Sequence, residues 1–175
     1  MLSLAQMAIL NTDARSATNA TALAAWIAAF DDQAIAAWYN QTPTGDFWVW
    51  RTRVGKAEMT QGTSVDGTTF SWVGAGFITR AQGERDAWRE LFDAGDGCNP
   101  SLANVRQAFQ DIFSGATAPA PANRLHLTTM SRRKCSRIEQ LLATGVGSVA
   151  SPGTLTFEGL LDYLDVARAL RNVGV

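Results

Sequence analysis

The chain has 175 residues, which is enough for a single domain to bury a hydrophobic core without disulfides or metal ions. Its 15 lysines and arginines nearly balance its 16 aspartates and glutamates, and this net charge of −1 argues against a dedicated nucleic-acid-binding protein. The single histidine and the absence of a Cys-x-x-Cys pair argue against a structural zinc site, and two cysteines in a chain of this length favour a reducing compartment.

The charges are distributed unevenly along the chain. Residues 1–50 hold one base and four acids, whereas residues 124–137 hold five bases and no acid. Such an asymmetry can orient subunits against each other or against a charged partner. The first residues lack the basic and apolar regions of a signal peptide, and no run approaches the ~18 apolar residues that a membrane span needs. We therefore expect a soluble protein that is not exported by the usual route and does not contact a membrane.

Apolar residues at helical spacing occur first in residues 2–10 and then in residues 18–40. The shorter segment predicts a helix with Ser3 as its N-cap. The longer segment is rich in alanine and carries one apolar face, and the alanines beside that face let other helices or subunits approach closely. Asp31 and Asp32 lie in the middle of this segment and could cap a second helix, so we expect either one bent helix or two consecutive helices.

Residues 46–54 combine three aromatic residues, two valines and two arginines. This composition is typical of an extended chain on a half-buried surface. We favour a core strand or an extended arm packed against helices. The alternative is a surface for a partner or a neighbouring subunit, formed by Phe47, Trp48, Trp50, Arg51 and Arg53.

Two antiparallel helices joined by a short glycine-containing loop are predicted next. The first begins with a capping box formed by Thr79 and Gln82 and ends at Gly95. The second begins at Asn99, an N-cap that Pro100 follows in the first helical position.

A third helix is predicted to begin at Asn123 as its cap and to end at Gly145. It contains a basic cluster of four residues, Arg132, Arg133, Lys134 and Arg137. One interpretation of the basic cluster is a solvated helix face, and the other is contact with an acidic subunit surface or with passing DNA phosphates. Aromatic residues for base stacking are missing between these charges, so we do not expect sequence-specific recognition.

The sequence contains few candidates for catalytic residues. The sequence contains neither a glycine-rich phosphate loop nor a Gly-x-Ser-x-Gly nucleophile elbow. His126 lies beside leucines in a helical pattern, which favours a hydrogen-bonded or partly exposed helix histidine over a general base. Cys135 follows Lys134, which could lower its pKa, but its place on an apolar stripe favours a buried, inert thiol. We therefore predict no enzymatic activity, no catalytic residue, no cofactor and no metal.

The elements together predict a mainly α fold in one domain spanning residues 1–175. We expect a bundle of about five to six helices with a few short strands or extended arms. Extended or loop segments are expected near residues 42–78 and 145–160, before a closing helix that Asp162 could cap.

Several motifs occur in one order along residues 2–171. They are residues 47–54 (FWVWRTRV), 104–108 (NVRQA), 133–137 (RKCSR), 141–147 (LLATGVG), 150–159 (ASPGTLTFEG) and 165–168 (DVAR). In this order they resemble a family of small virion proteins of tailed bacteriophages, found among head and neck genes. The resemblance implies a head–tail connector, or adaptor, that docks on the portal protein as a ring.

This resemblance also sets expectations for location and partners. It implies a homo-oligomeric ring, expected to be twelve-fold, in the virion neck, with the subunit in the host cytoplasm before assembly. The portal and the tail or neck proteins would be its partners, and DNA in the channel could contact the basic cluster non-specifically. Two alternatives remain open: a head decoration, minor capsid or tail-terminator protein, and a host-interaction protein that is absent from the virion.

Overall fold

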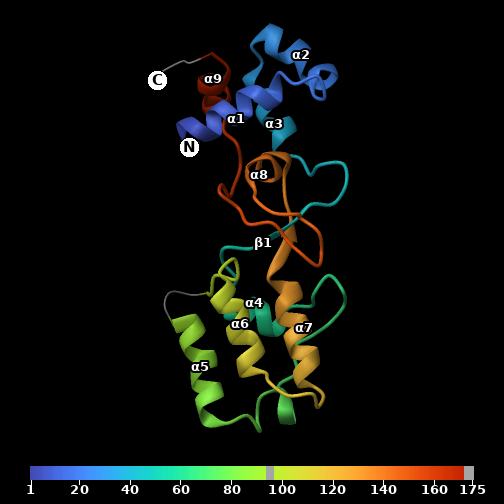
Figure 1. Cartoon of the computed structure of the whole chain (residues 1–175), viewed down its shortest axis with the longest axis vertical. Coiled ribbons are helices and arrows are strands. Elements are labelled where there is room, and N and C mark those ends of the chain that lie inside the picture. The colour runs from blue at the N-terminus through green and yellow to red at the C-terminus, as the bar shows by residue number, and fades with distance from the viewer. Residues whose placement is uncertain (94–96, 172–175) are drawn as a thin grey trace. The chain divides into compact units, whose positions relative to one another are not determined.

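The computed structural model describes residues 1–93 and 97–171, and Figure 1 shows the elements they form. Within these residues the chain is mainly helical, as predicted, with one two-stranded sheet of β1 (Trp48–Trp50) and β2 (Arg132–Lys134) and a short 3-10 helix η1 (Gly74–Gly76). The α-helices are α1 (Leu4–Ala14), α2 (Ala20–Ala29), α3 (Asp32–Tyr39), α4 (Lys56–Gln61), α5 (Gln82–Asp93), α6 (Ala103–Ile112), α7 (Ala120–Met130), α8 (Arg137–Leu142) and α9 (Tyr163–Arg171). None of these helices is both long enough and apolar enough to cross a membrane.

The sequence predicts a single domain, and the contacts in the structure group into two compact units. Unit 1 comprises Met1–Val49 and Lys134–Val175, and unit 2 comprises Trp50–Arg133. Each unit has its own cluster of buried apolar side chains, so each is described by itself.

Unit 1 is built from α1, α2, α3, α8 and α9, with α9 packed against α1 and α3. Ser3 caps α1 as predicted, in a capping box with Gln6. The alanine-rich segment forms two consecutive helices, because Phe30 adopts a left-handed φ of 57° and ends α2. Asp31 then accepts a hydrogen bond from the Ala34 amide at 3.0 Å, which begins α3.

Unit 2 has an aromatic core formed by Phe70, Trp88, Phe92, Phe109 and Phe113. The Phe70 and Trp88 rings stack with their centres 5.6 Å apart, and Phe113 meets Trp88 edge to face at 5.3 Å. These rings come from α5, α6 and the segments beside them, which pack side by side.

The predicted caps of α5 and α6 are wrong. α5 begins at Gln82, and Glu84 accepts a hydrogen bond from the Ala81 amide at 2.9 Å. Asn99 does not cap α6, because the Leu102 amide donates to the Asn99 carbonyl at 3.2 Å and closes a turn before the helix begins. The expected end of α5 at Gly95 lies outside the described residues.

The predicted long helix from Asn123 to Gly145 is also wrong, since α7, β2 and α8 replace it. The backbone between the two helices pairs with the segment around β1. In unit 2 the Arg51 amide donates to the Ser131 carbonyl at 2.9 Å, and in unit 1 the Cys135 amide donates to the Phe47 carbonyl at 3.2 Å. These strand hydrogen bonds replace the helical ones that a continuous helix would need.

Residues 145–160 are irregular, but hydrogen bonds attach them to the rest of unit 1. The Trp48 amide donates to the Gly147 carbonyl at 2.7 Å, and the Gly153 amide donates to the Trp48 carbonyl at 2.8 Å. Further along, the buried Glu139 accepts a hydrogen bond from the Gly159 amide at 3.1 Å. Asp162 then caps α9, as predicted, by accepting from the Leu164 amide at 2.8 Å.

Candidate interaction surfaces

The aromatic side chains of residues 46–54 pack inside the units. In unit 1, Val49 is fully buried, Trp48 is nearly so, and the Phe47 ring lies against the backbone of Gly147. In unit 2, Trp50 is half-buried and carries the Arg106 guanidinium 4.3 Å from its ring centre. These contacts favour the interpretation as a core strand. The partner-binding role of Phe47, Trp48 and Trp50 stays a prediction.

The two arginines of this stretch differ in their surroundings. Arg51 forms a two-pronged ion pair with Glu58, the second of its hydrogen bonds measuring 3.1 Å. Arg53 is exposed to solvent.

The basic cluster does not form one helix face. Arg132 pairs with Asp66 at 3.2 Å, and Arg133 is half-buried in the same short strand. Lys134 pairs with Asp46 at 2.7 Å. The prediction that one helix contains all four residues is therefore wrong, since three of them lie in β2.

Arg137, the last member of the basic cluster, lies in α8 of unit 1. Its guanidinium stacks over the Trp38 ring at 4.3 Å. Its Nη1 donates to the Trp38 carbonyl and to Gln41 Oε1, each at 2.9 Å. One nitrogen of the guanidinium is therefore hydrogen-bonded within unit 1. Arg137 thus has a structural role in addition to its positive charge.

His126 and both cysteines are buried. His126 lies within hydrogen-bonding distance of two backbone carbonyls, with Nε2 2.8 Å from Met59 and Nδ1 3.0 Å from Thr68. This confirms the predicted hydrogen-bonded helix histidine. Cys135 is buried, and burial raises the pKa of the Cys98 thiol to about 11. A protonated, inaccessible thiol is a poor nucleophile.

Sequence patterns missed a surface feature of unit 2, the apolar loop of residues 71–79. The loop is closed by backbone hydrogen bonds from the Ile78 amide to Trp72 at 3.3 Å and from the Gly76 amide to Val73 at 3.0 Å. Three of its apolar side chains point outward: Val73 is 74% exposed, Ile78 63% and Trp72 40%. These exposed apolar side chains make the loop a candidate interaction surface.

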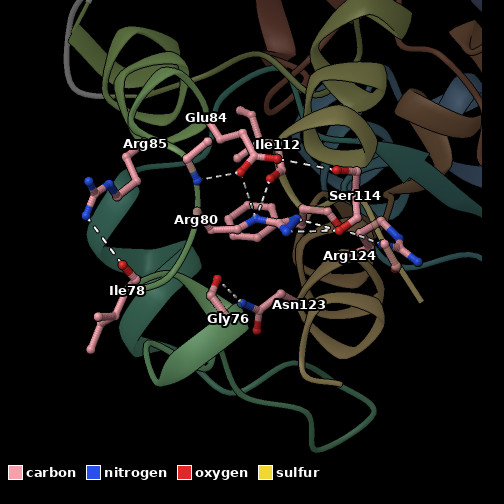
Figure 2. Close-up of polar contacts among 12 residues, drawn as sticks. Gly76, Ile78, Arg80, Glu84, Arg85, Ile112, Ser114, Asn123 and Arg124 are labelled. Carbon is pink, nitrogen blue, oxygen red and sulfur yellow. Dashed lines mark hydrogen bonds and ion pairs between the residues drawn. The ribbon is translucent and has the colours of Figure 1, made fainter. Parts of the chain in front are cut away.

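Asn123 of α7 positions the apolar loop. Its side-chain amide donates to the Ser71 carbonyl at 2.9 Å and to the Gly76 carbonyl at 3.0 Å, and its oxygen accepts from the Ser71 amide at 2.8 Å. Figure 2 shows the contact with Gly76. Asn123 was predicted to cap a helix. It lies inside α7 instead, where it is fully buried and its polar atoms are satisfied.

Two arginines attach neighbouring segments to the end of α6 and to the residues that follow it, as Figure 2 shows. Arg80 donates from Nε to the Ile112 carbonyl at 2.7 Å and from its Nη atoms to the Ser114 carbonyl. Arg124 donates to the Gly115 carbonyl at 2.9 Å. The Arg80 cation at the last carbonyl of α6 offsets the helix dipole, and because Arg80 directly follows the loop, it attaches the loop to α6.

Unit 1 contains a surface groove that could receive an apolar group. The unit 1 groove has a volume of about 470 Å³ and is lined by Ala8, Ile9, Thr12, Asp13, Ser16 and Leu141. Asp13 and Leu141 also line a second hollow of about 640 Å³, so the two are neighbours.

Asp13 is fixed in place within the groove by two donors. Its Oδ2 accepts from the Tyr39 hydroxyl at 2.7 Å and from Asn19 Nδ2 at 2.9 Å. Burial, reinforced by this hydrogen bond to Asp13, raises the pKa of Tyr39, so the phenol stays protonated as the donor. The groove therefore combines an apolar floor with one positioned carboxylate.

Among residues 1–93 and 97–171, no group of three or more His, Cys, Asp or Glu side chains could hold a metal ion. Comparison with known proteins found no match to a protein-family model, to a curated protein or to a solved structure.

Proposed function

We propose that this protein is a structural virion subunit that forms a head–tail connector, or adaptor, ring at the neck of a tailed bacteriophage. The observation that carries the proposal is the apolar loop, in which Val73 and Ile78 are more than half exposed on a closed backbone. An exposed apolar cluster is stabilised when another protein covers it. The order of sequence motifs along residues 2–171 supports the choice of a phage neck protein.

A second feature of the chain supports a role in assembly. Helix α2 consists almost entirely of apolar residues, yet Leu23 is the one residue of that helix that is buried. Its alanines leave a surface without long side chains, which neighbouring subunits can approach closely. Ring contacts join two different patches of the same subunit, and both the loop and α2 are available for them.

The proposed partners are other copies of the chain, the portal protein, and tail or neck proteins. We expect a twelve-fold ring in the virion and soluble subunits in the host cytoplasm before assembly. The basic cluster is the candidate for non-specific contact with DNA in the channel. A chain that works in this way turns over no substrate.

Imaging of the virion at side-chain resolution tests the proposal. We expect density for this chain as a ring between portal and tail. Density only on the capsid shell would identify a decoration or minor capsid protein, and a ring with the symmetry of the tail tube would identify a tail terminator. Mass spectrometry of purified particles that detects no copies would contradict every virion role and favour a host-interaction protein.

A further inference from the structure

We propose that the apolar loop of one copy docks into the unit 1 groove of the next copy, which makes a head-to-tail contact between subunits. This inference rests on the proposed ring function and names the contact that would build the ring. The loop belongs to unit 2 and the groove to unit 1, so one contact uses two different patches. Contacts of this kind repeat from copy to copy and close into rings or extend into filaments.

The apolar loop is organised for binding before a partner arrives. Asn123 and the backbone hydrogen bonds of the loop fix its path, so little conformational entropy is lost when it docks. Phe77 packs into the core of unit 2 and meets the Trp72 ring edge to face at 5.0 Å, which sets the direction of Trp72. Tryptophan is among the residues most enriched in interface hot spots, so Trp72 is the main anchor that the loop offers.

The unit 1 groove fits an apolar occupant that also brings a polar group. Ile9, which is partly exposed, and Leu141 give it an apolar lining. The same lining includes the exposed Thr12 and the carboxylate of Asp13, so a polar group of the occupant would meet polar partners there.

Charge favours a second copy as the occupant. By sequence, unit 1 holds five bases and eight acids, a net charge of −3, whereas unit 2 holds ten bases and eight acids, a net charge of +2. The same relation holds locally: Asp13 lies in the groove, and Arg85 lies beside the loop, with its Nη1 3.4 Å from the Ile78 carbonyl, as Figure 2 shows. Opposite charges of this kind steer a head-to-tail encounter and disfavour like patches meeting.

Cysteine cross-linking of mixed variants tests the contact directly. The native cysteines are buried, so the variants Val73→Cys and Ile9→Cys each add one accessible thiol. We expect mild oxidation of concentrated full-length protein to link the two variants when they are mixed, and to link neither variant to itself. Pairs of Val73→Cys with itself, or no cross-link in the mixture, would overturn the inference.

A matched pair of exposed valines tests the same contact by affinity. Val73 and Val65 both belong to unit 2 and are 74% and 72% exposed, so neither substitution should unfold the chain. Val73→Asp should weaken self-association at least about tenfold, because it brings a carboxylate into an apolar groove next to Asp13. Val65→Asp should leave the association unchanged in sedimentation equilibrium. Equal effects of both variants would contradict docking by the apolar loop.

The outcome of these tests is independent of the test of the proposed function, because they use the purified chain without portal or tail. A mixed cross-link from a chain that is absent from virions would support the contact and contradict the connector role. A neck location without the mixed cross-link would support the connector role and contradict the contact.

Discussion

Asn123 shows how a single side chain can determine a surface. It makes three hydrogen bonds to the backbone at Ser71 and Gly76, and in doing so it sets the path of a loop about fifty residues earlier in the chain. A buried amide that makes all of these hydrogen bonds stabilises the fold by more than its buried area suggests, because its removal leaves backbone groups without hydrogen-bond partners. The shape of the apolar loop therefore depends on a residue outside it.

Replacement of this amide should destabilise unit 2 and loosen the loop. We expect Asn123→Ala to lower the free energy of unfolding by about 2–4 kcal/mol, because it leaves buried polar groups of Ser71 and Gly76 unpaired. Asn104→Ala is the matched control, since Asn104 is an exposed asparagine of α6, where alanine is the better helix former. Urea unfolding of both variants measures the difference, and similar values would contradict this role of Asn123.

Cys98 should make the stability of the protein decrease at alkaline pH. Burial raises its pKa from 9.0 to about 11, so between these values the unfolded chain loses a proton that the folded chain keeps. The free energy of unfolding should therefore be unaffected below about pH 9 and fall above it, by up to about 1.4 kcal/mol per pH unit. Urea unfolding at several pH values should show this slope reduced in Cys98→Ala. Tyr39, whose pKa is also raised by burial, contributes in the same direction and is retained in the variant.

At the scale of elements, the irregular segment of residues 145–160 is attached to unit 1 through Phe47. A Cβ at Gly147 would lie 2.2 Å from that ring, and Gly147 has a φ of +71°. A Cβ at Gly153 would meet the same ring at 3.0 Å. Glycine is thus required where the backbone passes the aromatic face, which makes residues 145–160 part of the packing of unit 1.

Two glycine substitutions should have opposite effects. Gly147→Ala should lower the free energy of unfolding by about 2–4 kcal/mol, because it adds a steric clash to an unfavourable φ. Gly83→Ala should raise it by about 0.5–1 kcal/mol, since Gly83 lies in α5 with no atom within 4 Å of the added Cβ. Thermal unfolding of both variants provides the measurement, and destabilisation by Gly83→Ala would contradict this explanation.

Local periodicity is sufficient to predict α2, α3 and α6 as helices, because their apolar spacing lies within the elements themselves, but it places the start of α6 wrongly. It is not sufficient at residues 131–135. Leu127 and Ile138 keep helical spacing on both sides of that segment, but Phe47 and Arg51 take its backbone hydrogen bonds. Helical spacing in a sequence gives no sign that strand pairing with residues far along the chain will prevail.

The same limit applies to the candidate interaction surfaces. Residues 70–78 have the composition of an extended segment, and their sequence does not tell which apolar residues point outward. Phe77 packs inward and Val73 outward because Asn123 and the aromatic core fix the backbone between them. The basic cluster, by contrast, is evident in the sequence, but its ion pairs with Asp46 and Asp66 are not, since those acids lie far earlier in the chain.

At the scale of the whole molecule, unit 2 is one continuous segment with its own aromatic core. Its ends are close together, because the Arg51 amide donates to the Ser131 carbonyl at 2.9 Å. Unit 1, by contrast, is made of two segments on either side of unit 2 in the sequence. A continuous segment with neighbouring ends and a separate core has the features of an independently folding unit.

We therefore expect the fragment Trp50–Arg133 to fold by itself, with a cooperative thermal transition followed by circular dichroism. Trp88→Ala in the same fragment is the control. It removes a fully buried ring from the centre of the core, at a cost of about 3–5 kcal/mol, and should abolish the transition. A fragment that melts without cooperativity would show that unit 2 needs unit 1.

The packing of α1 against α9 has a consequence for biosynthesis. Helix α1 leaves the ribosome well before α9, because residues 15–162 lie between them, so α1 waits for its packing partner while these residues are translated. Residues 50–133 emerge in the meantime and can complete their own core first. Nascent chains arrested at successive lengths should accordingly become protease-resistant in the middle of the sequence before they do so at its beginning.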